Sequence, residues 1–417
     1  MGRLFKFKIT ILFLLIAYGT SAETITVEPN NPQKTIKKAF EIAKDGDTIL
    51  IKTGEYREGP LYLDKRVNLV GEDFPVIDGE FKHEILTVEH DGVTIKGILF
   101  KNSGTSNFND IAALKIKNSE NIIIENCKFV DNFFGIHTIN SKNITYENNE
   151  LRSRKMEGKP SANGIHCWKS NNLTIRNNKI IGHRDGIYFE FVNHTTIENN
   201  LSEGNNRYGL HFMFSHDNLF KNNTFQNNGA GVAVMYSKRV KMQHNHFKNN
   251  WGLSAYGLLL KEINDSEIQN NDFDENTIGV YADGANRIKV TGNNFFRNGW
   301  AFKINASSDD AEIFSNNFIG NTFDMATNGN LRVKTLDGNY WDKYEGYDLD
   351  RDGKGDIPYR PITFYSLIIE KNTSALMLFR SFFVKLMDTA ESVFPSLTPE
   401  AVKDNAPLIR KIKTDNK

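Results

Sequence analysis

Apolar and polar residues alternate in short segments that each begin with a glycine. After the glycine, the first and third residues are mostly apolar, as in Ile187 with Phe189 and Leu210 with Phe212. Alternate side chains of a strand point to opposite faces, so this pattern predicts one inner apolar face per segment. No helical period runs through these stretches. We therefore interpret them as short strands around a continuous core.

The glycine segments recur in register with a column of asparagines. The glycines are Gly135, Gly164, Gly186, Gly209, Gly231, Gly257 and Gly279, and the asparagines are Asn149, Asn178, Asn200, Asn223, Asn245, Asn271 and Asn293. Both columns step by 29, 22, 23, 22, 26 and 22 residues. A strand-based repeat near 22 residues predicts an all-β solenoid, a right-handed parallel β-helix. Asparagine tolerates the left-handed backbone of a corner, and stacked amides hydrogen-bond between coils, so we place these residues at corners.

Helical patterns flank the repeats. The pattern of residues 33–44 places four apolar side chains on one helical face: Ile36, Ala39, Phe40 and Ala43. We predict that this helix caps the first coil. Irregularly spaced strands follow at 48–52, 67–71 and 93–99. Residues 374–394 form a second amphipathic pattern, made by Leu376, Phe379, Phe383, Leu386, Met387 and Val393. This tail is either a packed C-terminal cap or a helix that docks on a partner.

Two insertions interrupt the regular coils. They span residues 152–163, which include Met156, and residues 251–256, and both directly precede a glycine segment. Equivalent corners lie on one edge of a solenoid, and long loops there often rim a binding face. The strands between the two insertions are therefore the place to look for a site.

Imidazole and thioether side chains gather on the outward face of those strands. The second and fourth residues after glycine include His166, His211, Met213 and Met235. Neighbouring outward positions lie about 7 Å apart along a strand and about 5 Å apart between strands. Neutral histidine and methionine ligands suit a soft ion such as Cu(I). We predict an exposed, transient Cu(I) site here, against the alternative that these side chains are ordinary outward residues packed under a loop.

Other residues that could have a catalytic or cross-linking role form no comparable cluster in the repeat. His183, Arg184 and Asp185 offer acid and base groups, but they also suit a solvated turn, and no paired carboxylate stands nearby in the repeat. The two cysteines, Cys127 and Cys167, occupy a corner and an inward column, so we expect no disulfide between them. The sequence therefore gives no convincing catalytic constellation.

An acidic loop follows the last coils. Asp348, Asp350, Asp352 and Asp356 alternate around Gly353, as in the first nine positions of a calcium loop. Tyr359 stands where a bidentate glutamate would close such a loop. We predict either a structural calcium site or a turn capped by its own carboxylates.

Composition and the N-terminus set the cellular context. The 417 residues carry 51 basic and 51 acidic side chains, so nucleic acid is an unlikely class of partner. Lys6 and Lys8 precede an apolar run and small residues at Thr20 and Ala22, the pattern of a secretory signal. We expect a signal peptide over 1–22, a β-helix with its cap and acidic loop over 23–361, and a helical tail over 362–417.

Four motifs stand out along the chain. They are Tyr-Gly-Leu-His-Phe-Met-Phe-Ser from Tyr208, Asn-Tyr-Trp-Asp from Asn339, Gly-Tyr-Asp-Leu-Asp from Gly346 with Asp-Ile-Pro-Tyr-Arg-Pro from Asp356, and Ala-Glu-Ser-Val-Phe-Pro-Ser-Leu-Thr-Pro from Ala390. Together they resemble the NosD family, the periplasmic β-helix accessory proteins of nitrous oxide reductase maturation in denitrification. The resemblance implies an inner-membrane ABC transporter with its membrane and ATPase subunits, a copper-chaperone lipoprotein as donor, and the reductase as recipient. It supplies no ligand positions, so the histidine and methionine column is our own inference.

The alternative function is a carbohydrate-active β-helix, a lyase or epimerase. Such an enzyme needs convergent carboxylates with arginine or lysine on adjacent coils, and the bracketed strands offer Glu190 and little else.

Overall fold

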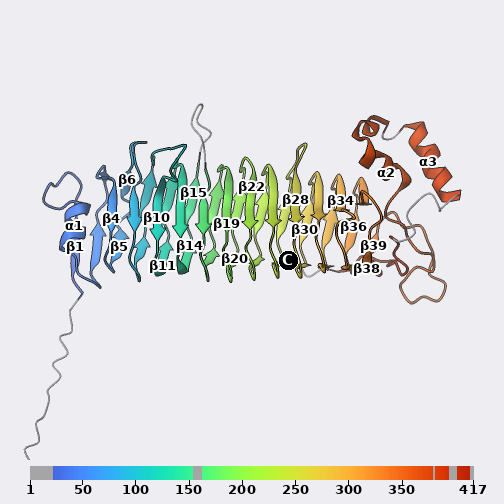
Figure 1. Ribbon diagram of the computed structural model, residues 1–417, viewed down its shortest axis with the longest axis horizontal. Coiled ribbons are helices and arrows are strands. Elements are labelled where there is room, and N and C mark those ends of the chain that lie inside the picture. Colours follow the sequence, from blue (N-terminus) through green and yellow to red (C-terminus); the bar gives the residue numbers. More distant parts are fainter. Residues whose placement is uncertain (1–21, 154–161, 379–380, 394–401, 414–417) are drawn as a thin grey trace, which may run out of the picture.

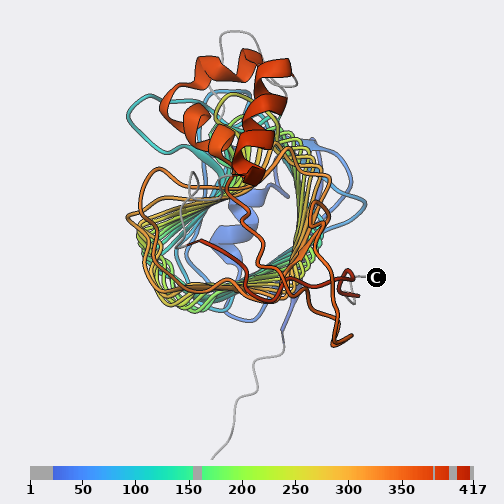
Figure 2. The ribbon, with the colours of Figure 1, turned by 90° about the vertical axis from the view of Figure 1, so that its right-hand side faces the viewer.

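The coils form a parallel β-helix whose cross-section has three sides (Figures 1 and 2). The computed structural model describes residues 22–153, 162–378, 381–393 and 402–413. Its strands form three parallel sheets of 14, 12 and 13 strands among the described residues. The predicted all-β fold is confirmed. Residues 1–21, most of the first insertion with Met156, and the side chains of Phe379 and Val393 lie outside what the structure describes.

The first sheet carries most of the corner asparagines at its exits. Its strands are β1 Thr24–Val27, β2 Thr48–Ile51, β5 Asn68–Gly71, β8 Thr94–Lys96, β11 Glu120–Glu125, β14 Lys142–Glu147, β17 Thr174–Arg176, β20 Thr196–Glu198, β23 Leu219–Lys221, β26 Lys241–Gln243, β29 Glu267–Gln269, β32 Lys289–Thr291, β35 Ala311–Phe314 and β38 Val333–Thr335.

The second sheet contains the predicted glycine segments, and we call it the glycine sheet. Its strands are β4 Leu61–Leu63, β7 Leu86–Val88, β10 Ala112–Lys117, β13 Phe134–Ile139, β16 Ile165–Trp168, β19 Asp185–Glu190, β22 Tyr208–Met213, β25 Ala230–Met235, β28 Tyr256–Lys261, β31 Ile278–Asp283, β34 Trp300–Ile304 and β37 Phe323–Ala326.

The third sheet closes each coil and supplies the phenylalanine stack. Its strands are β3 Glu55–Tyr56, β6 Val76–Asp78, β9 Leu99–Lys101, β12 Lys128–Val130, β15 Glu150–Arg152, β18 Lys179–Ile181, β21 Leu201–Glu203, β24 Thr224–Gln226, β27 His246–Lys248, β30 Asp272–Asp274, β33 Asn294–Phe296, β36 Asn317–Ile319 and β39 Tyr340–Trp341.

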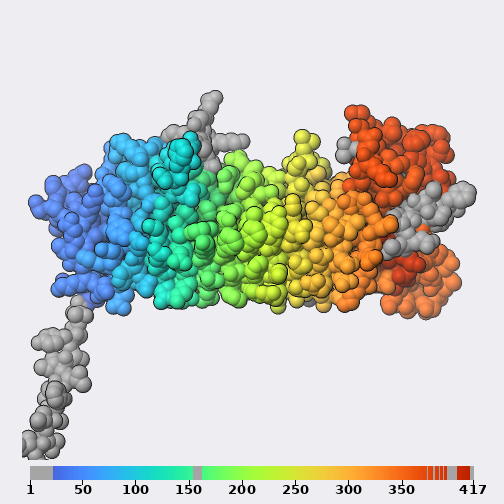
Figure 3. Space-filling model, in the orientation of Figure 1, coloured from blue at the N-terminus to red at the C-terminus, as the bar shows by residue number. Residues whose placement is uncertain are grey.

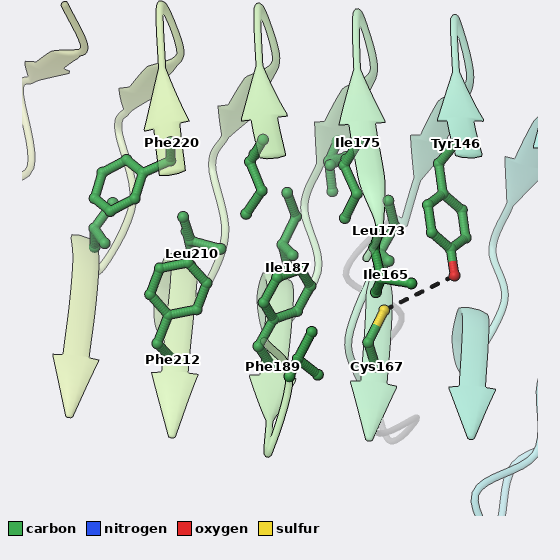
Figure 4. Packing of buried hydrophobic residues seen from close by; sticks show 14 of the residues in the cluster. Tyr146, Ile165, Cys167, Leu173, Ile175, Ile187, Phe189, Leu210, Phe212 and Phe220 are labelled. Atoms are coloured by element: carbon green, nitrogen blue, oxygen red, sulfur yellow. Dashed lines mark hydrogen bonds between the residues drawn. The ribbon is translucent and has the colours of Figure 1, made fainter. Parts of the chain in front are cut away.

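The predicted inward column of the glycine sheet is buried. Ile165, Ile187 and Leu210 follow one another in register, and Figure 4 shows them stacked from strand to strand beside Cys167, Phe189 and Phe212. The glycines lie where the backbones approach closely. A Cβ at Gly209 would stand 2.7 Å from the carbonyl oxygen of Gly231, so no larger residue fits without displacing the next coil. Cys127 and Cys167 are both buried and free, as expected.

The asparagine column forms a hydrogen-bonded ladder inside the coil. The Nδ2 of Asn178 donates to Oδ1 of Asn200, and the Nδ2 of Asn200 donates to Oδ1 of Asn223, at 3.0 and 2.9 Å. The ladder prediction holds, but the expected left-handed backbone at these asparagines is wrong. That conformation belongs to the preceding residue, as at Asn177 and Asn199 with φ near 57° and 56°, because the ladder residue itself turns inward.

A helix and a returning segment close the two ends. Helix α1, Ile36–Ile42, buries Ile36, Ala39 and Phe40 over the first coil, and its N-cap Thr35 accepts from the backbone N–H of Lys38. At the other end, Asp404 accepts from the backbone N–H groups of Gly338 and Asn339 and from Trp341 Nε1, each at 2.9 Å. These bonds satisfy groups that the last coil would otherwise leave unpaired.

The tail packs against the end of the glycine sheet. It consists of α2 Phe364–Lys371, the 3₁₀ helix η1 Thr373–Leu378 and α3 Phe382–Val393. Tyr365, Ile369 and Met387 pack on Phe323, and Lys303 pairs with Glu370 at 2.7 Å. Figures 1 and 3 show α2 and α3 rising from the same edge of the solenoid as the loop before β28. None of the described helices combines the length and apolar character required for a membrane span.

Candidate metal site on the glycine sheet

A column of aromatic and imidazole rings runs along the outward face of the glycine sheet. In strand register, His137 faces His166, His166 faces Tyr188, and Tyr188 faces His211. Their ring centroids are 4.5, 4.8 and 4.9 Å apart in that order. The parallel register of β13, β16, β19 and β22 produces this spacing, because each residue stands directly above its counterpart.

A pocket of ≈ 600 Å³ opens over the middle of this column. Three of the four predicted copper ligands, His166, His211 and Met213, line it, together with Tyr188 and Glu190. Its remaining walls are Arg184, Arg207, Ala162 and the segments that contain Ser106, Asn107, Asp110, Phe133 and Phe134. The structure therefore brings the predicted histidines and one methionine to a single cavity.

The fourth predicted ligand, Met235, lies just beyond that pocket. It is the register partner of Met213 on the next strand, and both side chains are partly exposed. Aromatic residues follow each of them in the chain: Phe214 after Met213 and Tyr236 after Met235, with ring centroids 5.0 Å apart. The two thioethers are thus adjacent on the face of the sheet and bordered by an apolar strip.

His211 is buried instead of exposed, so the prediction of a freely exposed site is wrong at this residue. The residue is 6% exposed. Tyr188 and Tyr208 contact the imidazole ring, with centroids at 4.9 and 4.7 Å. In the described chain, no hydrogen-bond partner reaches its Nε2. A buried nitrogen without a partner can accept an ordered water or an ion.

The other nitrogen of His211, Nδ1, contacts a buried ion pair. Asp185 is fully buried, and Arg207 donates from Nε to its Oδ1 at 2.8 Å and from Nη2 to its Oδ2. His211 Nδ1 lies 3.5 Å from Asp185 Oδ2 and 3.2 Å from Arg207 Nη2. Burial alone raises the pKa of Asp185, but the hydrogen bonds from His211 and Arg207 outweigh it and hold this pKa below its ordinary value. The carboxylate is therefore ionised.

The two histidines next along the column are neutral at ordinary pH. Burial lowers the pKa of His166 to about 3, and the nearby His137 and Arg184 lower it further. Burial likewise lowers the pKa of His137 to about 4. Within the described residues, Nδ1 of each ring has no hydrogen-bond partner. Neutral imidazole is the form that binds metal ions, so these rings require no deprotonation first.

In the sequence Asp185 stands out only as a candidate acid or base, and nothing there connects it with His211. The three consecutive residues His183, Arg184 and Asp185 have different environments in the structure. His183 is buried, Arg184 lines the pocket, and Asp185 pairs with Arg207. A signal was present in the sequence. Among the residues that directly precede the seven repeat glycines, only Asp185 is acidic, and it stands one coil before His211.

The acidic loop gathers its carboxylates in a different way. Oxygen atoms of Asp348, Asp350 and Asp352 lie within 4.8 Å of one another. Asp348 accepts from the backbone N–H groups of Asp352 and Gly353, and Asp352 accepts from that of Lys354. The fourth predicted ligand, Asp356, instead accepts from the N–H of Leu349 at 2.7 Å. Both predicted alternatives, a calcium site and a turn capped by its own carboxylates, fit this arrangement.

Comparisons with known proteins agree with the motifs. Residues 152–346 match the model of a family described as periplasmic copper-binding protein (NosD). A Pseudomonas aeruginosa protein, described as a probable ABC transporter binding protein NosD, is 33% identical over 72 residues. That match covers 17% of this chain and 17% of the relative.

Solved structures of other function share the fold. A family 28 exopolygalacturonase of Yersinia enterocolitica superimposes with a TM-score of 0.62 at 11% identity, over 77% of this chain and 79% of the enzyme. PfbA, a surface adhesin of Streptococcus pneumoniae, gives 0.52 at 15% identity, over 72% and 91%. Likeness at such low identity shows the β-helix alone. By its sequence motifs and by the match over residues 152–346, the chain resembles the NosD family across its central coils.

Proposed function

We propose that this protein handles copper in the periplasm, taking Cu(I) from a donor chaperone lipoprotein and passing it to nitrous oxide reductase during assembly of the copper centres. The family description supports a periplasmic, copper-related role. The relative's description as an ABC transporter binding protein supports an association with the membrane and ATPase subunits of such a transporter. Copper is cargo in this scheme, held transiently.

The observation that carries the proposal is the unpartnered Nε2 of His211. It is buried in the wall of a pocket that His166 and Met213 also line, and Met235 stands beside Met213. An imidazole nitrogen and thioether sulfurs are ligands that favour Cu(I) over Ca²⁺ or Mg²⁺. The strands hold these side chains at fixed spacing, so little conformational entropy is lost on binding.

The arrangement also suits transfer. His211 lies inside the pocket, whereas both methionines are partly exposed at its border. An incoming ligand from a partner can therefore reach the thioether side of the ion while the imidazole holds the other side. Rigid strands make this exchange independent of any unfolding of the coil.

The tail is the proposed contact with the membrane complex. Its inner residues, Tyr365, Ile369 and Met387, pack on the solenoid, but Phe382, Phe383 and Leu386 on α3 remain exposed. Exposed apolar patches of this kind commonly mark interaction sites. In this proposal α3 docks on the transporter and places the protein at the inner membrane.

The test is the double substitution Met213→Leu with Met235→Leu, measured by anaerobic competition with a Cu(I) chelator. Leucine keeps the volume, so stability should change by less than about 1.5 kcal/mol. Affinity should fall more than about tenfold, because both thioethers are removed. The matched control is Met242→Leu with Met325→Leu, two methionines buried in the core, which should bind like the parent.

Unchanged affinity in the double variant would place copper elsewhere, with the Met156 loop and the tail next to be tested. A carbohydrate-active β-helix remains the competing class. Saturable binding or cleavage of an acidic polysaccharide, with no measurable Cu(I) affinity, would favour that class and overturn the proposal.

A further inference from the structure

Two groups compete for Nδ1 of His211. Arg207 Nη2 lies 3.2 Å away and Asp185 Oδ2 lies 3.5 Å away. Arg207 also donates to Asp185 from its Nε and Nη2 atoms. The backbone N–H of Tyr208 also donates to Asp185 Oδ1 at 3.3 Å. The carboxylate is therefore held in one orientation, with Oδ2 turned toward the imidazole.

A neutral imidazole carries one proton, and its position decides what the ring can bind. With the proton on Nδ1, His211 donates to Asp185, and the Nε2 lone pair is free. With the proton on Nε2, Nδ1 accepts from Arg207, and the buried Nε2–H has no acceptor in the described chain. Only the first tautomer can bind a metal ion at Nε2.

The Nδ1–H tautomer is the more stable of the two in this setting. In it the Nδ1 proton faces Oδ2 of Asp185, 3.5 Å away, on a carboxylate that Arg207 binds through two hydrogen bonds. The other tautomer buries an Nε2–H donor that has no acceptor in the described chain. The same arrangement of carboxylate, imidazole and metal recurs in metalloproteins, where the carboxylate orients the ligand ring.

We propose that Asp185 is the positioning residue of the site: it accepts the Nδ1 proton of His211 and so presents the Nε2 lone pair to a soft metal ion, while Arg207 fixes the carboxylate. This inference rests on the proposed copper function for its purpose, but the tautomer itself is a property of the metal-free protein. Among the described residues, Nδ1 of His166 has no such partner, and the residue at the matching position of the preceding coil is Phe134.

The tautomer is measured by ¹⁵N NMR of the metal-free protein labelled at histidine, with His211→Gln to assign the signal. In the parent we expect His211 to be protonated at Nδ1. Asp185→Asn removes the anionic acceptor of the Nδ1 proton, while Arg207 can still donate to Nδ1, so the population should move toward the Nε2–H form. Cu(I) affinity should fall by roughly 10- to 100-fold in the same variant. Asp185→Glu, which keeps a carboxylate, should restore part of both.

The matched control is Asp217→Asn. Asp217 also binds an arginine through two bonds, from Arg239 Nε and Nη2 at 2.6 and 2.8 Å, but it has no contact with His211. This control removes the same charge and should alter neither the tautomer nor the affinity. It separates the loss of an ion pair from the loss of the imidazole's acceptor.

A parent His211 protonated at Nε2, or an Asp185→Asn variant with unchanged tautomer and affinity, would overturn the inference. If Asp185→Asn does not fold, Arg207→Gln gives a second test, because without the guanidinium the Nδ1–H form should persist, and its loss would contradict us. If the parent binds no Cu(I) but shows the expected tautomers, the proposed function fails, while the effect of Asp185 on the tautomer of His211 stands.

Discussion

The pocket on the glycine sheet and the acidic loop both gather metal-binding side chains, yet they differ in what those side chains already bind. In the loop, Asp348, Asp352 and Asp356 accept hydrogen bonds from backbone N–H groups of their own turn. In the pocket, Nε2 of His211 and Nδ1 of His166 lack partners among the described atoms. The pocket therefore keeps unused hydrogen-bonding capacity, whereas the carboxylates of the loop already bind the backbone of their own turn.

The pocket and the acidic loop also differ in which part of the fold positions their side chains. The pocket side chains project from strands whose inner faces form the continuous core. The loop is exposed and follows the last coil, where Asp404 and the residues after it close the end of the solenoid. Changes to the core should therefore affect the pocket first.

The largest expected effect comes from Ile187→Asp. Ile187 is fully buried behind Tyr188, and an unpaired carboxylate there should cost several kcal/mol, on the order of 3–5, of unfolding free energy. Coils contact only their neighbours, so hydrogen exchange should accelerate around β16–β22 before it does so in the acidic loop. Urea unfolding and hydrogen exchange measure both effects.

The control for this substitution is Thr196→Asp, an outward position of β20, which should change stability by no more than about 0.5 kcal/mol. Equal stability of the parent and Ile187→Asp would show that the inner and outer faces are assigned incorrectly.

A smaller effect should follow from pH. The pKa of His137 is about 4 in the folded chain, below its ordinary value of 6.5, because burial disfavours the charged form. Its contribution to stability is fully present above pH 6.5 and is lost as pH falls toward 4. His137→Phe should therefore remove up to about 3 kcal/mol of the acid destabilisation, measured by urea midpoints at pH 7.5 and 4.5.

An opposite control is His246→Gln. A hydrogen bond to Asp272 raises the pKa of His246, so this histidine stabilises the fold at acid pH and its removal should lower stability there. Identical pH curves for the parent and His137→Phe would mean that the histidine column is not kept neutral by burial.

The smallest effect concerns the acidic loop. If Asp348, Asp350 and Asp352 hold calcium, millimolar Ca²⁺ should stabilise the protein by about 1 kcal/mol or less, as expected for a weak exposed site. Asp348→Asn with Asp352→Asn should abolish this shift in thermal unfolding. The absence of any calcium effect in the parent would identify the loop as a capped turn alone.

Regular features of the coils were predictable because they repeat. The steps between glycines and between asparagines specify the β-helix, the inward column through Ile187 and Leu210, and the ladder through Asn178 and Asn200. Each of these contacts joins equivalent positions of adjacent coils, so sequence spacing alone determines them. The amphipathic pattern of 33–44 predicted the capping helix for the same local reason.

Tertiary structure alone decided the environment of the candidate site. The spacing placed His166, His211 and Met213 on one face, but it did not show that His211 is buried, or that Arg207 and Asp185 meet at its Nδ1. Nor did it show that Asp404 returns to close the last coil. These contacts depend on side-chain rotamers and on segments distant in sequence, and no repeat period encodes either of them.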